Sequence, residues 1–369
     1  MSSLDALFQP FKIRDLEIPN RFVMAPMTRS FSPDGVPGED VADYYQRRAA
    51  ADVGLILSEG TTIDRQGASS DPRVPNFVHE DSLAGWRSVI GAVHEVGGKM
   101  GPQLWHVGMM RKPGQGPYPE ADSDSPSGVT HTGKQVLPAP SDEEVADMVS
   151  AYAKAAGHAK DLGFDMIEIH GAHGYLIDQF FWSVMNQRDD RYGGSLEQRT
   201  EFAKEIIRQC RAAVGEGMPI FLRFSQWKQQ DYTARLAETP EALESFLGGL
   251  ADAGVDVFHC SQRRFWEPEF DGSDLNLAGW TRKLTGKPTV TVGSVGLDSD
   301  FFTSFAGQGA GASSHSGLED LAARVDRDEF DLVAVGRALL HDPAWVAKVK
   351  RGKFDALEGF DAASLQVLT

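Results

Sequence analysis

Short apolar runs alternate with longer amphipathic segments along this chain, and this alternation is the feature that most constrains its fold. The expected strands are residues 21–27, 54–60, 100–107, 166–170, 219–224, 255–261, 288–293 and 332–336. The expected helices are residues 41–50, 82–96, 142–162, 195–214, 240–253, 277–284, 318–325 and 343–349. Strands that alternate with helices predict a parallel sheet, and eight such units close naturally into a (β/α)8 TIM barrel.

Local signals support this interpretation. Ser195 with Gln198 has the spacing of a capping box, and Gly163 and Gly215 lie just beyond expected helix ends. An open doubly wound sheet is the alternative, but no Gly-x-Gly-x-x-Gly pattern follows the first strand. We therefore expect one α/β domain over residues 1–369, with an N-terminal hairpin within residues 7–19 that plugs the barrel bottom.

Two connections break the rhythm of the repeats. Residues 108–140, which follow the third strand, are rich in Gly, Pro and Ser, and a loop this long favours a lid over the barrel mouth. Residues 306–317 form a Gly/Ser/Ala tract that we expect to be a surface loop rather than a site.

Composition restricts the possible partners. The formal net charge of -17 disfavours binding to nucleic acid or to anionic membranes. Cys210 and Cys260 are the only cysteines, which argues against a disulfide framework or an iron–sulfur cluster. With no apolar run near the roughly 18 residues of a membrane span and no visible secretory signal, we expect a cytoplasmic monomer or homodimer that acts on a small molecule.

The C-terminal strand ends are where barrels of this class carry their chemistry. The first strand ends in Ala25-Pro26-Met27-Thr28 and the second in Glu59-Gly60. The third strand carries Gln103, Trp105 and His106, and the fifth carries Arg223 and Ser225. The seventh and eighth end in Gly293-Ser294-Val295-Gly296 and Gly336-Arg337. Loops after these two strands commonly bind phosphate, although the glycines could also simply end the strands.

The fourth strand ends in a cluster of ionisable side chains. His170 and His173 are three residues apart, so they would face one direction on a helical turn, and Tyr175 follows closely. A catalytic zinc usually needs a third protein ligand, which this segment does not supply, so we expect no metal. Two neutral imidazoles can instead polarise one carbonyl or nitro oxygen, and a phenol can donate a proton. Structural histidines beside a packed aromatic are the plainer interpretation.

Three stretches resemble the Old Yellow Enzyme family of NADH:flavin oxidoreductases, in that family's order. They are HGAHGYLIDQFFWSVMNQRDDRYGGSLEQR from His170, the opening LFQPFKIRDLEIPNRFVMAPMTRS, and VAVGRALLHDP at the eighth strand. Thr28 rather than Cys follows Pro26-Met27, as in the classical branch. The resemblance implies an FMN-binding barrel in which NAD(P)H reduces the non-covalently bound flavin. The reduced flavin would then reduce enones, enals or nitroalkenes, with nitroesters and quinones as further candidates.

The resemblance also implies roles for individual residues. Ala25, Pro26, Met27, Thr28 and Gly60 would wrap the flavin, Gln103 and Arg223 would hold its pyrimidine edge, and Gly293, Ser294, Val295, Gly336 and Arg337 would form the phosphate end of the site. His170 and His173 would grip the substrate oxygen beside Trp105, and Tyr175 would donate the proton.

Departures from the family pattern leave some alternatives open. Residues 226–238 do not match better-known members, and Arg263, Arg264 and Trp266 could contact nicotinamide or substrate or simply cover the barrel mouth. Phe354 and Phe360 are both candidates for a C-terminal aromatic near the site. The rival functions are a flavin-free barrel acting on a phosphorylated small molecule and a flavin-binding protein without redox activity. A dienoyl-CoA reductase is a weaker rival, because the cysteine cluster for its iron–sulfur centre is missing.

Overall fold

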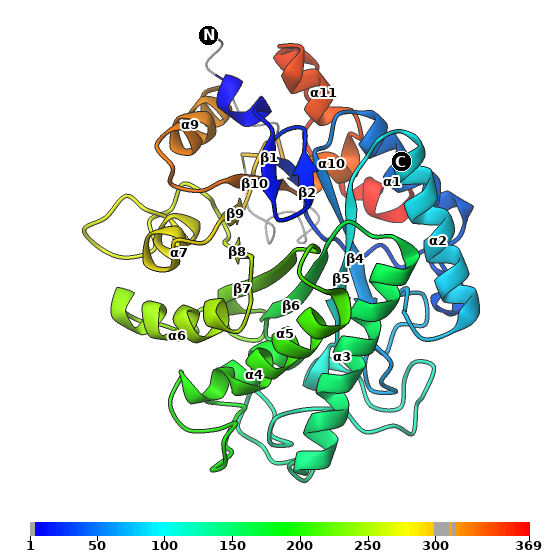
Figure 1. Cartoon of the computed structure of the whole chain (residues 1–369), viewed down its shortest axis with the longest axis vertical. Coiled ribbons are helices and arrows are strands. Elements are labelled where there is room, and N and C mark those ends of the chain that lie inside the picture. The colour runs from blue at the N-terminus through cyan, green and yellow to red at the C-terminus, as the bar shows by residue number, and fades with distance from the viewer. Residues whose placement is uncertain (1–3, 299–309, 312–314) are drawn as a thin grey trace.

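A closed barrel of parallel strands forms the centre of the molecule (Figure 1). The computed structural model describes residues 4–298, 310–311 and 315–369. The barrel strands are β3 (Phe22–Met24), β4 (Leu55–Thr62), β5 (Met100–Trp105), β6 (Ile167–His173), β7 (Ile220–Lys228), β8 (Val257–Ser261), β9 (Thr289–Val292) and β10 (Leu332–Val335). Their order around the barrel follows the chain, and β10 closes it against β3. The expected TIM barrel and its eight strands are confirmed.

Helices surround the barrel on the outside (Figure 1). They are α1 (Glu39–Ala50), α2 (Glu80–Glu95), α3 (Asp142–Leu162), α4 (Leu176–Phe181), α5 (Glu201–Val214), α6 (Pro240–Asp252), α7 (Leu277–Thr285), α9 (His315–Asp326), α10 (Arg337–His341) and α11 (Trp345–Lys350). Every expected helix is present. Helices α4 and α10 were not expected, because helices of 6 and 5 residues directly after a strand are too short to show a helical period.

Local chemistry explains where the helices begin and end. At the start of α3, Ser141 and Glu144 form a reciprocal capping box, and Gly163 ends the helix with a left-handed φ of 90°. Ser195 and Gln198 exchange the same pair of bonds before α5. These contacts satisfy the backbone groups that a helix end leaves without partners.

The N-terminal hairpin lies at the bottom of the barrel, as expected. Its strands β1 (Phe11–Ile13) and β2 (Leu16–Ile18) pair antiparallel. Ile13, Leu16 and Ile18 belong to one buried cluster with inward-facing barrel residues such as Leu57 and Val257. This apolar layer seals the lower end of the barrel and leaves the C-terminal end of the strands for a ligand.

The long connection after β5 is anchored at several points. Asp124 accepts a hydrogen bond from Arg65 at 2.6 Å and pairs with His106 at 2.8 Å. Arg188, which follows α4, donates to the carbonyls of Pro126 and Pro140 at 3.0 and 2.9 Å. Residues 108–140 are thus fixed at the rim of the barrel beside the loop after α4. Most of the expected surface loop at residues 306–317 lies outside the described residues.

Candidate active site

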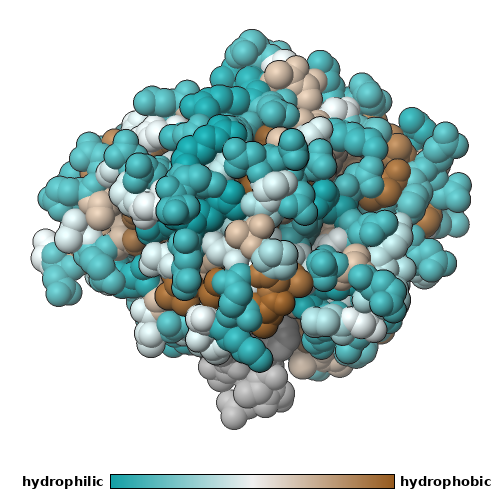
Figure 2. Space-filling model, turned by 90° about the horizontal axis from the view of Figure 1, so that it is seen from below, coloured by the Kyte–Doolittle hydropathy of each residue, from teal (hydrophilic) through white to brown (hydrophobic). Residues whose placement is uncertain are grey.

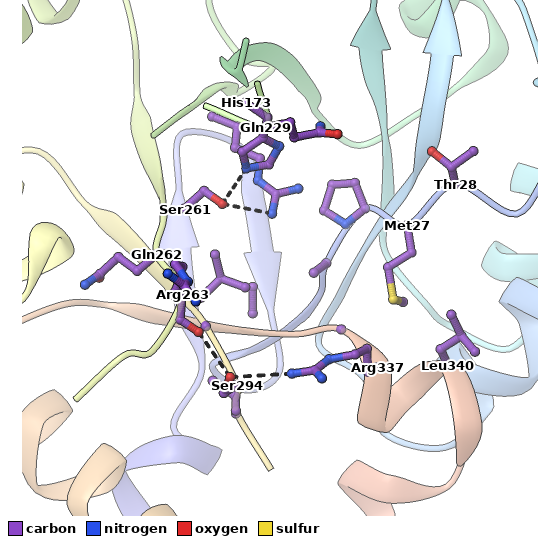
Figure 3. A pocket seen from close by; sticks show the side chains of 18 of the residues that line it. Met27, Thr28, His173, Gln229, Ser261, Gln262, Arg263, Ser294, Arg337 and Leu340 are labelled. Carbon is purple, nitrogen blue, oxygen red and sulfur yellow. Dashed lines mark hydrogen bonds between the residues drawn. The ribbon is translucent and has the colours of Figure 1, made fainter. Parts of the chain in front are cut away.

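A cavity of about 680 Å³ lies at the C-terminal end of the strands (Figure 3). Almost all of the expected site residues line it: Ala25, Pro26, Met27, Thr28, Gln103, Trp105, His170, His173, Tyr175, Arg223, Gly293, Ser294, Val295, Gly336 and Arg337. They come from six different strand ends, which the closed barrel brings to one place. The exception is Gly60. A Cβ on Gly60 would lie 2.6 Å from the Trp105 ring, so Gly60 packs against Trp105 and does not line the cavity.

The His170–His173 pair does not lie on a helical turn, and that expectation is wrong. Both residues belong to β6, and the pairing of β6 with β7 shifts between Gly171 and His173. His173 takes a positive φ of 65°, which turns its side chain toward His170. The two rings lie 5.2 Å apart between centroids, and the Tyr175 ring lies 5.0 Å from that of His170. An irregular strand end, rather than helical periodicity, brings the three rings together.

The protonation of the two imidazoles follows from their surroundings. The backbone N–H of Ala172 donates to Nδ1 of His170 at 3.3 Å, which leaves the proton of a neutral ring on Nε2. Nε2 of His173 lies 2.7 Å from the Ser261 hydroxyl (Figure 3), which also accepts from Arg223 at 3.3 Å. Burial, assisted by the charge of Arg223, holds the pKa of both histidines well below the usual range. Both rings are therefore neutral hydrogen-bonding groups at pH 7.

Tyr175 stands edge-on to Trp105, with the ring centroids 5.1 Å apart. Burial raises the pKa of the Tyr175 phenol above its ordinary value. The hydroxyl therefore stays protonated at neutral pH. A neutral phenol beside two neutral imidazoles provides hydrogen-bond donors and one transferable proton in the wall of a largely apolar cavity.

The turn that carries these side chains is fixed by a buried ion pair. Asp178 accepts from the backbone N–H of Gly174 at 2.7 Å and from Nζ of Lys228 at 2.7 Å, and both side chains of the pair are fully buried. The hydroxyl of Ser225 accepts from the backbone N–H of His173 at 3.0 Å. Neither Asp178 nor Lys228 was given a role from the sequence, because nothing in their spacing shows that β7 extends far enough to place Lys228 under α4.

Comparisons with known proteins agree with this geometry. The family described as NADH:flavin oxidoreductase / NADH oxidase matches residues 6–356. The chain is a member of the Old Yellow Enzyme family. It is 34% identical over 366 residues to the flavin oxidoreductase hxnT of Emericella nidulans, covering 95% of this chain and 92% of that protein. It is 31% identical over 340 residues to the NADPH dehydrogenase of Bacillus subtilis, covering 91% and 92%.

A solved structure of morphinone reductase superposes on this chain with a TM-score of 0.79 and 28% identity. The match covers 97% of this chain and 92% of morphinone reductase. The NADH oxidase of Thermoanaerobacter brockii is 34% identical over 364 residues, and the chain spans 52% of that longer protein. Family membership makes this protein an FMN-dependent, NAD(P)H-dependent oxidoreductase of the ene-reductase type. It does not favour the flavin-free alternative.

The residues present fit FMN. Nε of Arg223 is buried and has no hydrogen-bond partner among the described residues, so the cavity offers a donor that an acceptor-bearing ring edge would satisfy. At the other end, the Arg337 guanidinium donates to the Ser294 hydroxyl at 3.4 Å (Figure 3). Gly293 has a φ of 144°, and a Cβ there would lie 2.9 Å from the backbone at Arg263 and Arg264. A cation beside glycine-rich backbone suits a phosphate.

Several lining residues of this family member were not expected from its sequence. They are Trp227, Gln229, Tyr232, Gln262, Leu340 and Leu365, together with Arg263 and Phe360 from the undecided groups. Trp227 and Tyr232 belong to the stretch that departs from the better-known members. Between the two C-terminal candidates, Phe360 lines the cavity and Phe354 does not. Trp266 is exposed and is not among the lining residues.

Proposed function

We propose that this protein reduces the C=C bond of enones, enals and nitroalkenes, with His170, His173 and Tyr175 sharing the work. When bound in the cavity, FMN would supply the hydride chemistry that links NAD(P)H to the β-carbon of the substrate. The observation that carries the proposal is that a neutral imidazole, His173, and a protonated phenol, Tyr175, each lie about 5 Å from the neutral imidazole of His170, with all three rings lining the cavity.

His170 and His173 bind the activating oxygen of the substrate. The Nε2–H of His170 is free to donate, because Ala172 occupies Nδ1. Donation from neutral rings stabilises the negative charge that develops on a carbonyl or nitro oxygen as the double bond is attacked. The apolar walls of the cavity strengthen these bonds by excluding water.

Tyr175 gives its phenolic proton to the α-carbon. Its raised pKa keeps that proton in place until charge develops on the substrate. Asp178 and Ser225 hold the backbone on either side of this turn, so the phenol and the imidazoles keep a fixed relation to each other.

The chain's own residues provide complementary ends for the cofactor. Gln103 and Arg223 would hold the pyrimidine edge, Ala25 to Thr28 and Gly60 would flank the ring, and Gly293, Ser294, Val295, Gly336 and Arg337 would hold the phosphate. Residues 108–140, anchored at the barrel rim, would act as a lid, and Trp105 would contact substrate.

We also infer a cytoplasmic enzyme that works as a monomer or homodimer on small molecules. Both cysteines are free and buried, which suits a reducing compartment. Among the described residues no helix is long and apolar enough to cross a bilayer. The face shown in Figure 2 is predominantly hydrophilic, as expected for a net charge of -17.

The test is oxidation of NADPH and NADH by the purified yellow protein in the presence of 2-cyclohexenone, a nitroalkene and a quinone. Turnover with the first two and stoichiometric loss of the C=C bond would support the proposal. A protein that holds flavin and oxidises NAD(P)H but leaves every unsaturated acceptor unchanged would contradict it.

A further inference from the structure

A second layer of polar side chains lies inside the barrel, one step below the proposed reaction site. Gln103 of β5 lies opposite Glu168 of β6 in the strand register, and Arg223 of β7 lies opposite His259 of β8. All four are buried, at 3%, 0%, 8% and 0% exposure. Two residues further down each of β6, β7 and β8, the inward positions are the apolar Met166, Phe221 and Val257. A charged layer therefore separates the apolar plug from the cavity.

Glu168 is the centre of this layer. Its Oε1 accepts from Nε2 of Gln103 at 2.7 Å, and its Oε2 lies 2.6 Å from Nδ1 of His259. Two N–H donors suit an ionised carboxylate, which can only accept. Burial lowers the pKa of His259, and its Nε2 has no partner among the described residues, so this ring is a neutral donor through Nδ1. Both partners of Glu168 are therefore neutral, and neither cancels its charge.

Arg223 is the cation in the same layer. It donates to the Ser261 hydroxyl, and among the described residues no carboxylate lies within salt-bridge distance of it. Burial lowers the pKa of Arg223, and the charge of Glu168 acts in the opposite direction. The negative charge of Glu168 thus acts against the positive charge of Arg223 without direct contact, because electrostatic interactions are weakly screened in the protein interior. Arg223 lines the cavity and Glu168 does not.

We propose that Glu168, held in place by His259 and Gln103, sets the reduction potential of the flavin by opposing the charge of Arg223. This inference rests on the proposed function, because it takes Arg223 to lie at the pyrimidine edge. Reduction adds negative charge at that edge, which a nearby cation favours and a buried carboxylate disfavours. Glu168 therefore lowers the potential and makes the reduced ring a stronger hydride donor.

The experiment is measurement of the midpoint potential of the holoenzyme against reference dyes, for the wild type and for Glu168→Gln. The amide keeps the shape of the side chain and removes its charge. We expect a shift to a more positive potential, with at least a tenfold higher ratio of reduced to oxidised flavin at a fixed dye ratio, which corresponds to about 30 mV for a two-electron couple. An unchanged or more negative potential would overturn the proposal.

Asp256→Asn is the matched control. Asp256 is a buried carboxylate just before β8, at the start of the strand whose middle residue is His259, and it pairs with Arg14 and Arg211. We expect this variant to keep the wild-type potential, and an equal shift in it would also overturn the proposal.

A double variant, Glu168→Gln with His259→Asn, removes the same charge and replaces the contact with an amide–amide pair. If the single variant does not fold, the double variant takes its place in the measurement. We expect it to show the same positive shift of the midpoint potential. Loss of FMN binding in both variants, with Asp256→Asn intact, would overturn the proposal and assign the pair to binding instead. Because potentials are measured without substrate, a wild-type enzyme that fails to reduce enones would contradict the proposed function alone.

Discussion

Trp227 stacks on His173, with ring centroids 4.6 Å apart and planes inclined by 23°. The indole N–H also donates to the carbonyl of Ser261 at 3.2 Å, and the hydroxyl of Ser261 contacts the same imidazole. His173 is therefore fixed by a stacked ring on its face and a hydroxyl at its edge. Trp227 of β7 and Ser261 of β8 thus orient a side chain of β6.

The first prediction concerns this stack. Trp227→Leu should weaken the binding of phenolic ligands and raise KM for enones by about 2- to 10-fold, the range expected for losing an aromatic pair. Titration of the oxidised enzyme with a phenol measures the effect. Trp227→Phe, which keeps an aromatic face, is the control and should lose less. Equal losses in the two variants would show that stacking on His173 contributes nothing.

A second prediction separates the two half-reactions. Tyr175→Phe removes the proton donor but keeps the ring against Trp105, so it should slow enone reduction by about 10²- to 10⁴-fold, as loss of a general acid does. Reduction of the flavin by NAD(P)H should be unchanged. Stopped-flow measurement of each half-reaction tests this, and an equal loss in both would remove Tyr175 from its assigned role.

The third prediction concerns the grip on the activating oxygen. His170→Ala and His173→Ala should each weaken phenol binding, because each removes one hydrogen-bond donor, at about 0.5–1.5 kcal/mol per neutral bond. Ser261→Ala should have a smaller effect of the same sign, because it frees His173 without removing it. If binding by both histidine variants matches the wild type, the imidazoles do not contact the ligand.

Much of this site could be predicted from the sequence, because it is carried by strand ends. The alternation of strands and helices gives the barrel, and the barrel brings Arg223, Gly293 and Arg337 to one rim. His170 and Tyr175 follow from the same rule. The local geometry of this segment could not be predicted, because the bulge before His173 depends on the pairing of β6 with β7 and not on the residues next to it in the sequence.

The part that could not be predicted comes from residues without a periodic signal. The Asp178–Lys228 pair joins positions 50 residues apart, and its partners meet only because β7 runs on to Lys228. Phe360 was one of two C-terminal candidates, and the choice between it and Phe354 could not be made because the short 3-10 turns of this segment leave no helical pattern. Such contacts depend on tertiary distances, which spacing along the chain does not encode.

The fourth prediction tests that buried pair. Lys228→Met leaves the Asp178 carboxylate buried without its cation and should lower the free energy of unfolding by about 3–5 kcal/mol. The double variant Lys228→Met with Asp178→Asn removes both charges and should recover much of the loss. Denaturant unfolding of the holoenzymes measures both. A double variant no more stable than the single one would mean that the pair is not coupled.

The last prediction concerns pH. Burial of Glu59 raises its pKa to about 7, although the backbone N–H groups of Arg29 and Ser30 both donate to its carboxylate. Because the folded state holds this proton more tightly than the unfolded state, stability should fall as the pH rises from about 4.5 to 7 and then level off. The total loss from this group is on the order of 3 kcal/mol. Glu59→Gln removes the ionisation while keeping an acceptor for the two N–H groups, so its unfolding free energy should vary less over this window and exceed that of the wild type at pH 8. Parallel pH profiles for the two proteins would show that Glu59 ionises as readily in the folded chain as in the unfolded one.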